Sequence, residues 1–332
     1  MAKHNRIIAL KSSLEGPEAV NSSGIPQTGI KDLEEERRGA GFVVRTMTNF
    51  LDGGEAATRT REKIMMEFER EPHFRVDDTP DLTRSELRER YAARLGSIAH
   101  WIKSEGREEF QNRLNNLVLV DPGFLTRIGV HFGLFVNTII NQGSEEQVQF
   151  WLDRGMEDFK GVIGCFAMTE LGHGSNVSGL ETVATFDINT DEFIVHSPTL
   201  TSTKWWIGGA AESATHSVVY AQMVVGGKNY GVKPFVVQLR NPKDFKSVPG
   251  VAIGDNGAKM GRNGIDNGWI QFTNVRIPRT NLLMRYTKVT KDGKVSEPPF
   301  AQLAYGALLY GRCMMIKGIA TINKLFRKCN VC

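Results

Sequence analysis

Residues 165–209 read CFAMTELGHGSNVSGLETVATFDINTDEFIVHSPTLTSTKWWIGG, and the spacing of apolar residues changes at this stretch. Before it, apolar residues recur every three or four positions, as they do on one face of a helix. Within it, segments such as Thr182–Phe186 and Phe193–His196 are strand-like in composition and alternation. The sequence therefore predicts helices first and a β domain from about Val162 onward.

More strands and the turns between them are expected downstream. Strand-like segments lie at residues 217–225, 235–239 and 269–275. Two short runs of turn-forming residues, Asn189–Asp191 and Val225–Asn229, stand between strand segments and predict hairpins. A hairpin joins neighbouring strands in opposite directions, so we expect an antiparallel β-barrel domain over residues 161–285.

The residues before the β domain carry helical signals. Thr83 and Glu86 have the spacing of a capping box, in which each residue satisfies a backbone N–H of the other. An apolar stripe spaced for one helix face follows, formed by Leu87, Tyr91, Leu95 and Ile98. Further helical pieces are expected at residues 58–70, 131–140 and 145–152. Residues 31–160 are therefore predicted to form a helical domain.

The two ends of the chain differ from this pattern. Residues 1–30 are rich in Ser, Gly, Asn and Pro without periodicity, and we expect a flexible N-terminal segment there. Residues 286–332 are predicted to begin a second helical domain, because helix-forming residues run from Ala301 to Lys328. The expected fold class is α+β, with an N-terminal all-α domain, a central antiparallel β-barrel domain and the start of a C-terminal helical domain.

Composition narrows the classes of function. The 332 residues suffice for two domains, and a net charge of +4 with both signs intermixed does not suggest a nucleic-acid binder. The CxxC at Cys329–Cys332 lacks the second ligand pair of a zinc site, so no metal is expected. No apolar run approaches the ~18 residues of a membrane span. Residues 330–332 are not a peroxisomal Ser-Lys-Leu address.

Two constellations stand out within the opening stretch. In residues 165–176, Gly172, Gly174 and Ser175 would let backbone approach a ligand, although a plain glycine-rich loop fits the composition as well. Neither a Walker motif nor a dinucleotide fingerprint is present there. In residues 203–209, two tryptophans beside two glycines suit a planar ring system, and the alternative is that both indoles pack in the core.

Two more constellations lie downstream. Residues 259–269 form a turn-rich run that leads into a strand. Tyr305 and Arg312 are seven residues apart and share one helix face. Arg312 could hold a phosphate, or it could only interact with the helix dipole.

The order of these segments resembles acyl-CoA oxidases. The resemblance covers about residues 31–312, is closest to the fungal-type peroxisomal enzymes, and rests on a series of short matches. They are Leu51–Gly54, Thr169–Ser175, Gly179–Thr182, Lys204–Gly209, Ile265–Gly268 and Arg276–Arg279. The TELGHGS and KWW-x-GG segments distinguish oxidases from acyl-CoA dehydrogenases.

This resemblance implies a cofactor, a substrate and an assembly. The cofactor would be FAD, contacted by Phe166, Ala167, Met168, Thr169, Gly174, Ser175, Trp206 and Gly208. The groove for a fatty acyl-CoA would be lined by Gln302, Leu303, Ala304, Tyr305 and Arg312. In the family, C-terminal helical domains complete the active site and a homodimer.

The implied reaction is α,β-dehydrogenation of a fatty acyl-CoA to the trans-2-enoyl-CoA, with O2 reduced to H2O2. It is the first step of peroxisomal fatty acid β-oxidation, so the resemblance also implies a peroxisomal location. In the family the base is a glutamate of the C-terminal helical domain, and this chain ends before that region. We therefore assign no catalytic residue, do not promote Glu170, Glu181 or Asp266 to the base, and expect a truncated chain that is inactive alone.

Two alternatives remain open at this point. The chain could be a non-catalytic relative that binds acyl-CoA or pairs with a full-length subunit. It could also be an acyl-CoA dehydrogenase, which passes electrons to a carrier protein, although the two segments above argue against that.

Overall fold

The computed structural model describes residues 38–39 and 41–297. The chain divides into two compact units, and the described part of the first ends at Thr60, whereas the second begins at Arg61. The expected flexible segment 1–30 and the expected helix-forming run from Ala301 to Lys328 lie outside the described residues.

The first unit contains the amphipathic helix α3 (Val44–Asp52) and the start of α4 (Glu55–Arg70). Helix α3 ends at Gly53, whose φ of 93° lies in the left-handed region that glycine adopts without strain. The Gly54 N–H then donates to the Asn49 carbonyl at 2.7 Å. The Leu51–Gly54 segment is therefore a helix stop in this structure.

The helices of the second unit follow the predicted order. After α4 they are α5 (Arg84–Ser104), α6 (Arg107–Val120), α7 (Pro122–Ile128), the π-helical segment η3 (Gly129–Val136), α8 (Asn137–Gln142) and α9 (Glu145–Asp153). Short 3-10 turns occur at Pro72–Phe74, Thr79–Asp81, Val177–Gly179 and Arg279–Asn281.

Helix α5 confirms the predicted start and the predicted apolar face. Thr83 and Glu86 form the capping box. Tyr91, Leu95 and Ile98 are buried in a core that also contains residues of α4, α6 and α7. Burial of this stripe therefore holds the helices together, as the spacing indicates.

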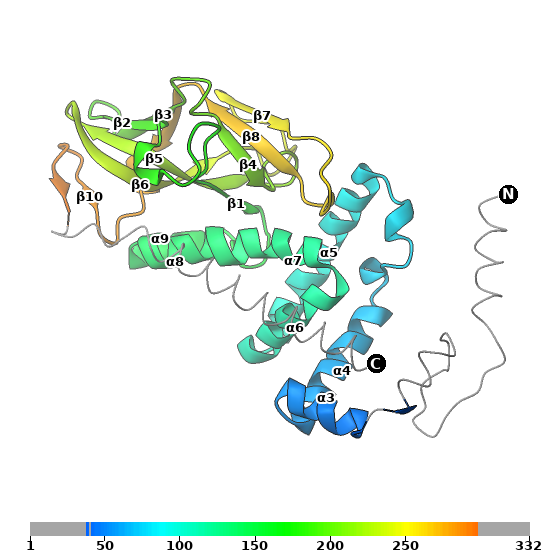
Figure 1. Cartoon of the computed structure of the whole chain (residues 1–332). Coiled ribbons are helices and arrows are strands. Elements are labelled where there is room, and N and C mark those ends of the chain that lie inside the picture. The colour runs from blue at the N-terminus through cyan, green and yellow to red at the C-terminus, as the bar shows by residue number, and fades with distance from the viewer. Residues whose placement is uncertain (1–37, 40, 298–332) are drawn as a thin grey trace. The chain divides into compact units, whose positions relative to one another are not determined.

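The segment Pro122–Gln142 is one continuous helical run that links the two halves of the second unit (Figure 1). It begins where the Asp121 carboxylate accepts the Phe124 N–H at 2.9 Å, with Pro122 at the first helical position. Phe124 at its start packs in the helical core, whereas Phe135 and Ile139 pack under the β domain. The same helix therefore supplies side chains to two cores.

By length and composition alone, this helix is also apolar enough to cross a membrane, with a mean hydropathy of 1.3. Its most apolar 18-residue stretch is 56% buried inside the protein, and the helix carries the buried polar side chains Arg127 and His131. Packing on two cores accounts for its apolar composition, which is the pattern of a central core helix.

The β domain consists of one larger sheet, a three-stranded sheet and a short hairpin. The strands of the larger sheet are β1 (Gly164–Ala167), β2 (Val183–Asp187), β3 (Glu192–His196), β5 (His216–Val225), β6 (Lys228–Gln238) and β9 (Val275–Pro278). The smaller sheet has the order β4-β8-β7, with β4 (Lys204–Gly208), β7 (Val251–Asp255) and β8 (Asn267–Phe272). Strands of both sheets surround one apolar core, which makes a half-barrel.

Most strand pairs are antiparallel, and both predicted hairpins are confirmed. Strands β2 and β3 pair antiparallel across the Asn189–Asp191 turn. Strands β5 and β6 are joined by Gly226 and Gly227, whose φ angles of 56° and 78° suit a two-residue hairpin turn.

Two pairings differ from the antiparallel expectation. Strand β1 pairs parallel with residues 216–219 of β5, and β2 pairs parallel with residues 222–224 of the same strand. After β1 the chain moves away from β5, passes through residues 168–182, and comes back beside β5 as β2, again in the direction of β5. The larger sheet is therefore mixed. The alternation of apolar residues does not record this return, which is why the sequence did not predict the parallel pairs.

The described residues after 285 also differ from the expected helical domain. Strands β10 (Lys288–Val289) and β11 (Val295–Ser296) form an antiparallel hairpin. Val289 is buried in the core of the β domain. Residues 286–297 therefore extend the β domain, because an apolar side chain of this hairpin completes its core.

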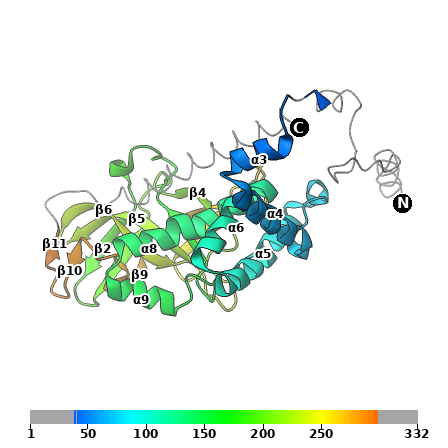
Figure 2. The same cartoon turned by 90° about the horizontal axis from the view of Figure 1, so that it is seen from below.

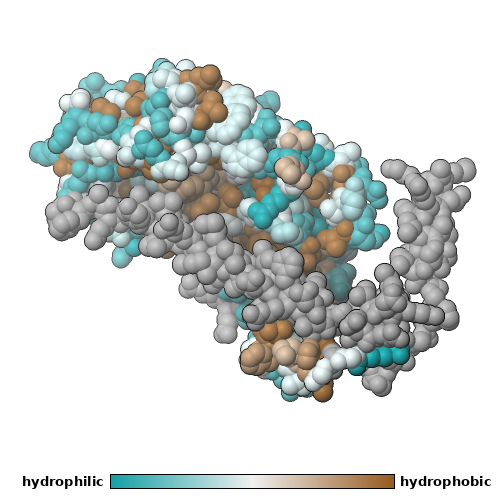
Figure 3. All heavy atoms as spheres, in the orientation of Figure 1, coloured by the Kyte–Doolittle hydropathy of each residue, from teal (hydrophilic) through white to brown (hydrophobic). Residues whose placement is uncertain are grey.

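A second apolar core lies between the larger sheet and the helices α8 and α9, which lie below the strands in Figure 1 and in front of them in Figure 2. On the face drawn in Figure 3, hydrophilic and neutral residues cover most of the β domain, and hydrophobic groups gather toward its lower margin. Gly164 of β1 lies directly on the Phe135 ring, so a Cβ at this position would overlap that ring.

We expect Gly164→Ala to destabilise the protein by about 1–3 kcal/mol, because the added methyl group must displace a fully buried phenylalanine. Gly96→Ala is the matched control, since nothing lies within 4 Å of its added Cβ and alanine favours helix α5. Urea unfolding of both variants measures the difference. Equal stabilities would contradict the packing argument.

His131 joins the long helix to the start of the β domain. Its Nδ1 accepts the Gly164 N–H at 2.8 Å, and its Nε2–H donates to the Met156 carbonyl at 2.7 Å, an assignment that follows from the two partners. Burial, with Arg127 nearby, lowers the pKa of His131 to about 3. The imidazole is therefore neutral in the folded protein at neutral pH.

This histidine makes folding stability depend on pH. Between pH 6.5 and 3 the unfolded chain takes up a proton that the folded chain does not, so the stabilisation is complete above pH 6.5 and falls as pH decreases. We expect the difference in unfolding free energy between wild type and His131→Gln to shrink by about 1.4 kcal/mol per pH unit below 6.5. Urea unfolding at pH 7, 6 and 5 tests this. A constant difference would show that His131 is not the responsible group.

Candidate functional site

The first two sequence constellations lie side by side. The Leu171 N–H donates to the Thr203 carbonyl at 2.8 Å, and the Trp205 N–H donates to the Thr169 carbonyl at 3.0 Å. Between these bonds, Glu170 and Lys204 form a β-bridge. Residues 169–172 therefore run antiparallel to residues 201–205, although the two segments lie far apart in sequence.

A buried ion pair stands at the centre of this arrangement. Lys204 Nζ lies 3.0 Å from Glu170 Oε1, and both side chains are fully buried. The same ammonium group donates to the Met168 carbonyl at 3.2 Å and to the Tyr220 carbonyl at 2.7 Å. All three N–H donors of the lysine are thereby satisfied.

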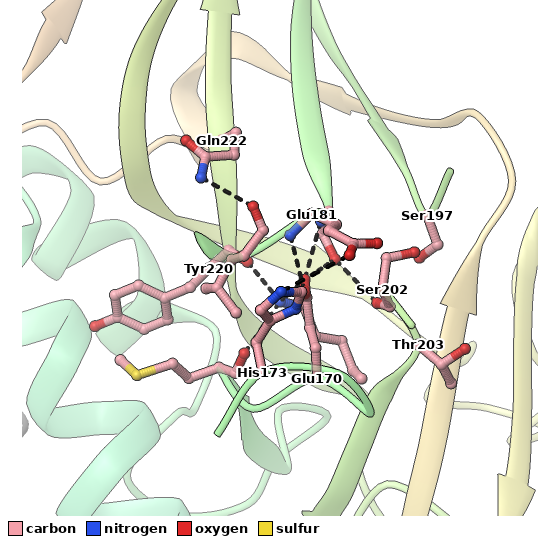
Figure 4. A network of polar contacts seen from close by, with 12 residues as sticks. Glu170, His173, Glu181, Ser197, Ser202, Thr203, Tyr220 and Gln222 are labelled. Atoms are coloured by element: carbon pink, nitrogen blue, oxygen red, sulfur yellow. Dashed lines mark hydrogen bonds and ion pairs between the residues drawn. The ribbon is translucent and has the colours of Figure 1, made fainter. Parts of the chain in front are cut away.

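Glu170 holds several further donors, which Figure 4 shows converging on its carboxylate. It accepts the backbone N–H of Glu181 at 2.8 Å and of Thr182 at 2.9 Å, as well as the Thr182 hydroxyl at 2.6 Å. His173 Nδ1 lies 3.2 Å from Glu170 Oε2, the carboxylate oxygen that does not face Lys204. The carboxylate thus joins the glycine-rich loop to the segment Gly179–Thr182.

The two charges of the pair have shifted pKa values. Burial acts to raise the pKa of Glu170, but the Lys204 charge and the hydrogen bonds outweigh it, so the net direction is down. Burial lowers the pKa of Lys204 to about 8, and Glu170 opposes that shift. At neutral pH both groups are charged, so the pair is an ion pair.

Trp206 departs most clearly from ordinary strand geometry. Its side chain is 54% exposed and its φ of 62° lies in the left-handed region, which is uncommon for a bulky residue. The pairing of β4 with β8 shifts between Lys204 and Ile207, so a β-bulge lies here. Asn267 Nδ2 donates to the Trp206 carbonyl at 3.2 Å and helps to hold the bulge. The alternative in which both indoles pack in the core does not hold for Trp206.

The glycines of the loop have different surroundings. A Cβ at Gly172 would press on Thr201, and one at Gly208 would meet Val130 at 3.2 Å. Nothing lies within 4 Å of the same position at Gly174. Thr169, Gly174 and Ser175 are exposed. Gly172 and Gly208 therefore serve close packing, whereas Gly174 leaves open space beside exposed backbone.

The remaining predicted flavin contacts lie on β1 and directly after it. The half-buried ring of Phe166 packs on Tyr220, with the ring centroids 5.2 Å apart. Ala167 and Met168 are buried in the two opposite cores of the β domain. Only their backbone groups are therefore available to a ligand on the exposed side.

The third constellation supports the end of β4. Asp266 accepts the backbone N–H groups of Glu212 at 2.9 Å and Ser213 at 2.7 Å. Its carboxylate lies 3.7 Å from Arg127 Nε of the long helix. Gly209, with a φ of 87°, lies so close to the Arg127 guanidinium that a Cβ would come within 2.9 Å of it. The turn after Gly208 is therefore fixed to the helical domain.

Several sequence expectations fall elsewhere. The predicted substrate residues Gln302, Leu303, Ala304, Tyr305 and Arg312 lie outside the described residues. In the matched segment Arg276–Arg279, Arg276 pairs with Asp187 and Glu192, and Arg279 pairs with Asp191. This segment therefore ties β9 to the β2–β3 hairpin.

Sequence reasoning missed the roles of Lys204 and Arg127. Lys204 directly precedes two tryptophans, and Arg127 lies in a mostly apolar run. A charged residue in such surroundings is unusual, and this was the available signal. Their partners are 34 and 139 residues away in sequence, so the pairing itself was not readable.

Comparison with known proteins adds the family context. Residues 43–160 match the family described as "Acyl-coenzyme A oxidase N-terminal", and residues 165–275 match "Acyl-CoA dehydrogenase, middle domain". Acyl-coenzyme A oxidase 2 of Yarrowia lipolytica is 50% identical over 294 residues, which cover 89% of this chain and 42% of that protein. The acyl-coenzyme A oxidase of Debaryomyces hansenii is 47% identical over 297 residues, with the same coverage. The chain thus spans less than half the length of these curated relatives.

Solved structures agree with these matches. The crystal structure of acyl-CoA oxidase 3 from Yarrowia lipolytica superposes with a TM-score of 0.80 at 50% identity, over 90% of this chain and 44% of that one. Acyl-CoA oxidase-2 of Caenorhabditis elegans, bound with FAD, ascaroside-CoA and ATP, gives a TM-score of 0.75 at 35% identity, over 86% and 43%. With its helical region followed by a β half-barrel and these relatives across both parts, the chain belongs to the acyl-CoA oxidase family.

Proposed function

We propose that this chain supplies the FAD-binding surface of an acyl-CoA oxidase that converts a fatty acyl-CoA to the trans-2-enoyl-CoA. The observation that carries the proposal is the exposed, left-handed Trp206 beside the exposed Thr169 on the bulged edge of β4. A strained backbone conformation persists only where the surrounding structure enforces it, and such residues cluster at ligand-binding and active sites.

The residues present fit a flavin. Trp206 offers an exposed aromatic face, and the open space at Gly174 lets a ligand approach the backbone. Thr169 and Ser175 offer exposed hydroxyls, whereas Ala167 and Met168 would contribute backbone groups. The FAD in the C. elegans relative, which shares this fold, supports the same assignment.

The chemistry divides between the cofactor and the protein. When bound, FAD accepts the hydride that leaves the β-carbon of the acyl-CoA, and its reoxidation by O2 gives hydrogen peroxide. In our proposal the Thr169 hydroxyl hydrogen-bonds the flavin ring, and Trp206 lies against it and excludes water. Gly174, Ser175 and the backbone of Gly208 hold the rest of the cofactor.

The carboxylates of the site have other tasks. Glu170 is buried against Lys204, and Asp266 holds Arg127 and two backbone N–H groups. Glu181 accepts hydrogen bonds from Thr199 and Thr201, which lower its pKa. A base for the α-proton benefits from a raised pKa and free access. We therefore infer that the base is none of these three, and that it comes from the family's C-terminal helical region.

Further parts of the proposal rest on family membership. They are the substrate groove at Gln302–Tyr305 and Arg312, the use of O2, a homodimer and a peroxisomal location. The same surface in a dehydrogenase would pass electrons to a carrier protein, which the peroxide assay below distinguishes.

The first test is a titration of FAD into the 332-residue protein, in which binding is measured by the quenching of flavin fluorescence. We expect saturable but weak binding that gel filtration reverses. We expect no peroxide with fatty acyl-CoA, because none of the three carboxylates of the site is free to act as the base. Absence of saturable quenching would contradict the FAD assignment. Robust peroxide formation would contradict the inference about the base.

Trp206→Gly separates ligand binding from stability. Glycine relieves the left-handed strain, so we expect the fold to gain up to about 1 kcal/mol, while FAD affinity falls because the aromatic face is lost. Phe245→Gly is the matched control, since Phe245 is an exposed aromatic residue at a φ of 54° in the loop after β6. It should leave FAD affinity unchanged. Equal affinity in both variants would remove Trp206 from the site.

A further inference from the structure

Lys204 occupies a gap in the pairing of β5. Strand β1 pairs with β5 up to Val219, and β2 resumes the pairing at Gln222. The Tyr220 carbonyl lies between these two points and accepts its hydrogen bond from Lys204 Nζ at 2.7 Å. The lysine side chain therefore takes the place of a strand neighbour where the chain leaves β5 to form the glycine-rich loop.

The ammonium group also holds both neighbours of Thr169 in the chain. It donates to the Met168 carbonyl at 3.2 Å and pairs with Glu170 at 3.0 Å. Thr169, between them, is exposed, and its carbonyl accepts the Trp205 N–H. The backbone on each side of the Thr169 hydroxyl is thereby fixed to one buried charge.

The same residue sets the position of Trp206. Lys204, the first residue of β4, pairs with Ile270 just before the bulge, and Trp206 follows two residues later. The Lys204 side chain is anchored to three carbonyl or carboxylate oxygens. These contacts restrain the Lys204 backbone, and a shift of that backbone would move the bulge that follows it. The two exposed groups assigned to the flavin thus share one anchor.

We propose that Lys204 and Glu170 are positioning residues, which fix the Thr169 hydroxyl and the Trp206 ring relative to each other for flavin binding. This inference rests on the proposed function and deepens it. Neither residue touches the cofactor in this proposal, since both side chains are fully buried.

The alternative is that the pair only stabilises the fold. Removal of one member of a buried ion pair is strongly destabilising, whereas replacement of both members by neutral groups is often tolerated. A double variant therefore restores stability without restoring the anchor. Lys204→Met combined with Glu170→Gln is suitable, because methionine has no donor for the Tyr220 and Met168 carbonyls.

The experiment measures FAD affinity, the absorption spectrum of bound FAD and thermal unfolding for four proteins. They are the wild type, Glu170→Gln, Lys204→Met and the double variant. We expect each single variant to bind FAD about tenfold more weakly, by the loss of one buried charged contact. We expect the double variant to unfold at a temperature closer to that of wild type, yet to keep the weak affinity and an altered flavin spectrum.

Arg94→Met provides the matched control. Arg94 forms a comparable buried pair with Asp121 at 2.5 Å, within the helical core. This variant should lose stability while its folded fraction keeps the FAD affinity and spectrum of wild type. Glu170→Gln, the mildest of the changes, keeps the test decisive if Lys204→Met does not fold.

The outcomes separate the two proposals. If wild type binds no FAD, the proposed function itself fails. If wild type binds FAD and Trp206→Gly weakens binding, but affinity and spectrum recover together with stability in the double variant, the pair is structural and the positioning inference is overturned.

Discussion

The arrangement of the site depends on one buried ion pair, Lys204 with Glu170. Two charges inside a protein are costly unless every donor and acceptor is satisfied. Here the lysine has three acceptors, and the glutamate accepts from backbone, hydroxyl and imidazole groups as well. These partners come from the residue after β1, from β5, from the glycine-rich loop and from the segment before β2. The need to satisfy two buried charges therefore brings distant parts of the sequence together.

A second set of contacts fixes this assembly to the helices. Arg127 of the long helix reaches Ser213 and Asp266, and His131 four residues later holds the start of β1. Across the same boundary, Arg88 of α5 binds Glu212 and Asp255. Since β1 leads into the glycine-rich loop and Asp266 supports the turn after β4, the helical domain positions both sides of the exposed surface. The helices thus contribute to the site without lining it.

Local patterns predicted the parts of the fold that local chemistry determines. The Thr83 capping box, the Tyr91–Leu95–Ile98 face and the Gly226–Gly227 turn all depend on residues within a few positions of each other. The parallel pairing of β1 and β2 with β5 depends on a fifteen-residue return that no periodicity records. The bulge at Trp206 was equally hidden, because exposure of an indole in a strand is decided by tertiary contacts. The family segments drew attention to the residues of this surface, but not to which of them are buried in structural contacts and which are exposed.

That division bears on the chemistry. The matched segments hold Glu170, Glu181 and Asp266, and each carboxylate is already engaged by donors that stabilise its charged form or hold a turn in place. A carboxylate that a fold requires to be ionised and bound is poorly suited to take up a substrate proton, since protonation would cost the fold those contacts. The exposed groups, Thr169, Ser175 and Trp206, have no acid–base role at neutral pH. Under the proposed function, this surface therefore holds and orients a redox cofactor, and a group other than these three carboxylates takes the substrate proton.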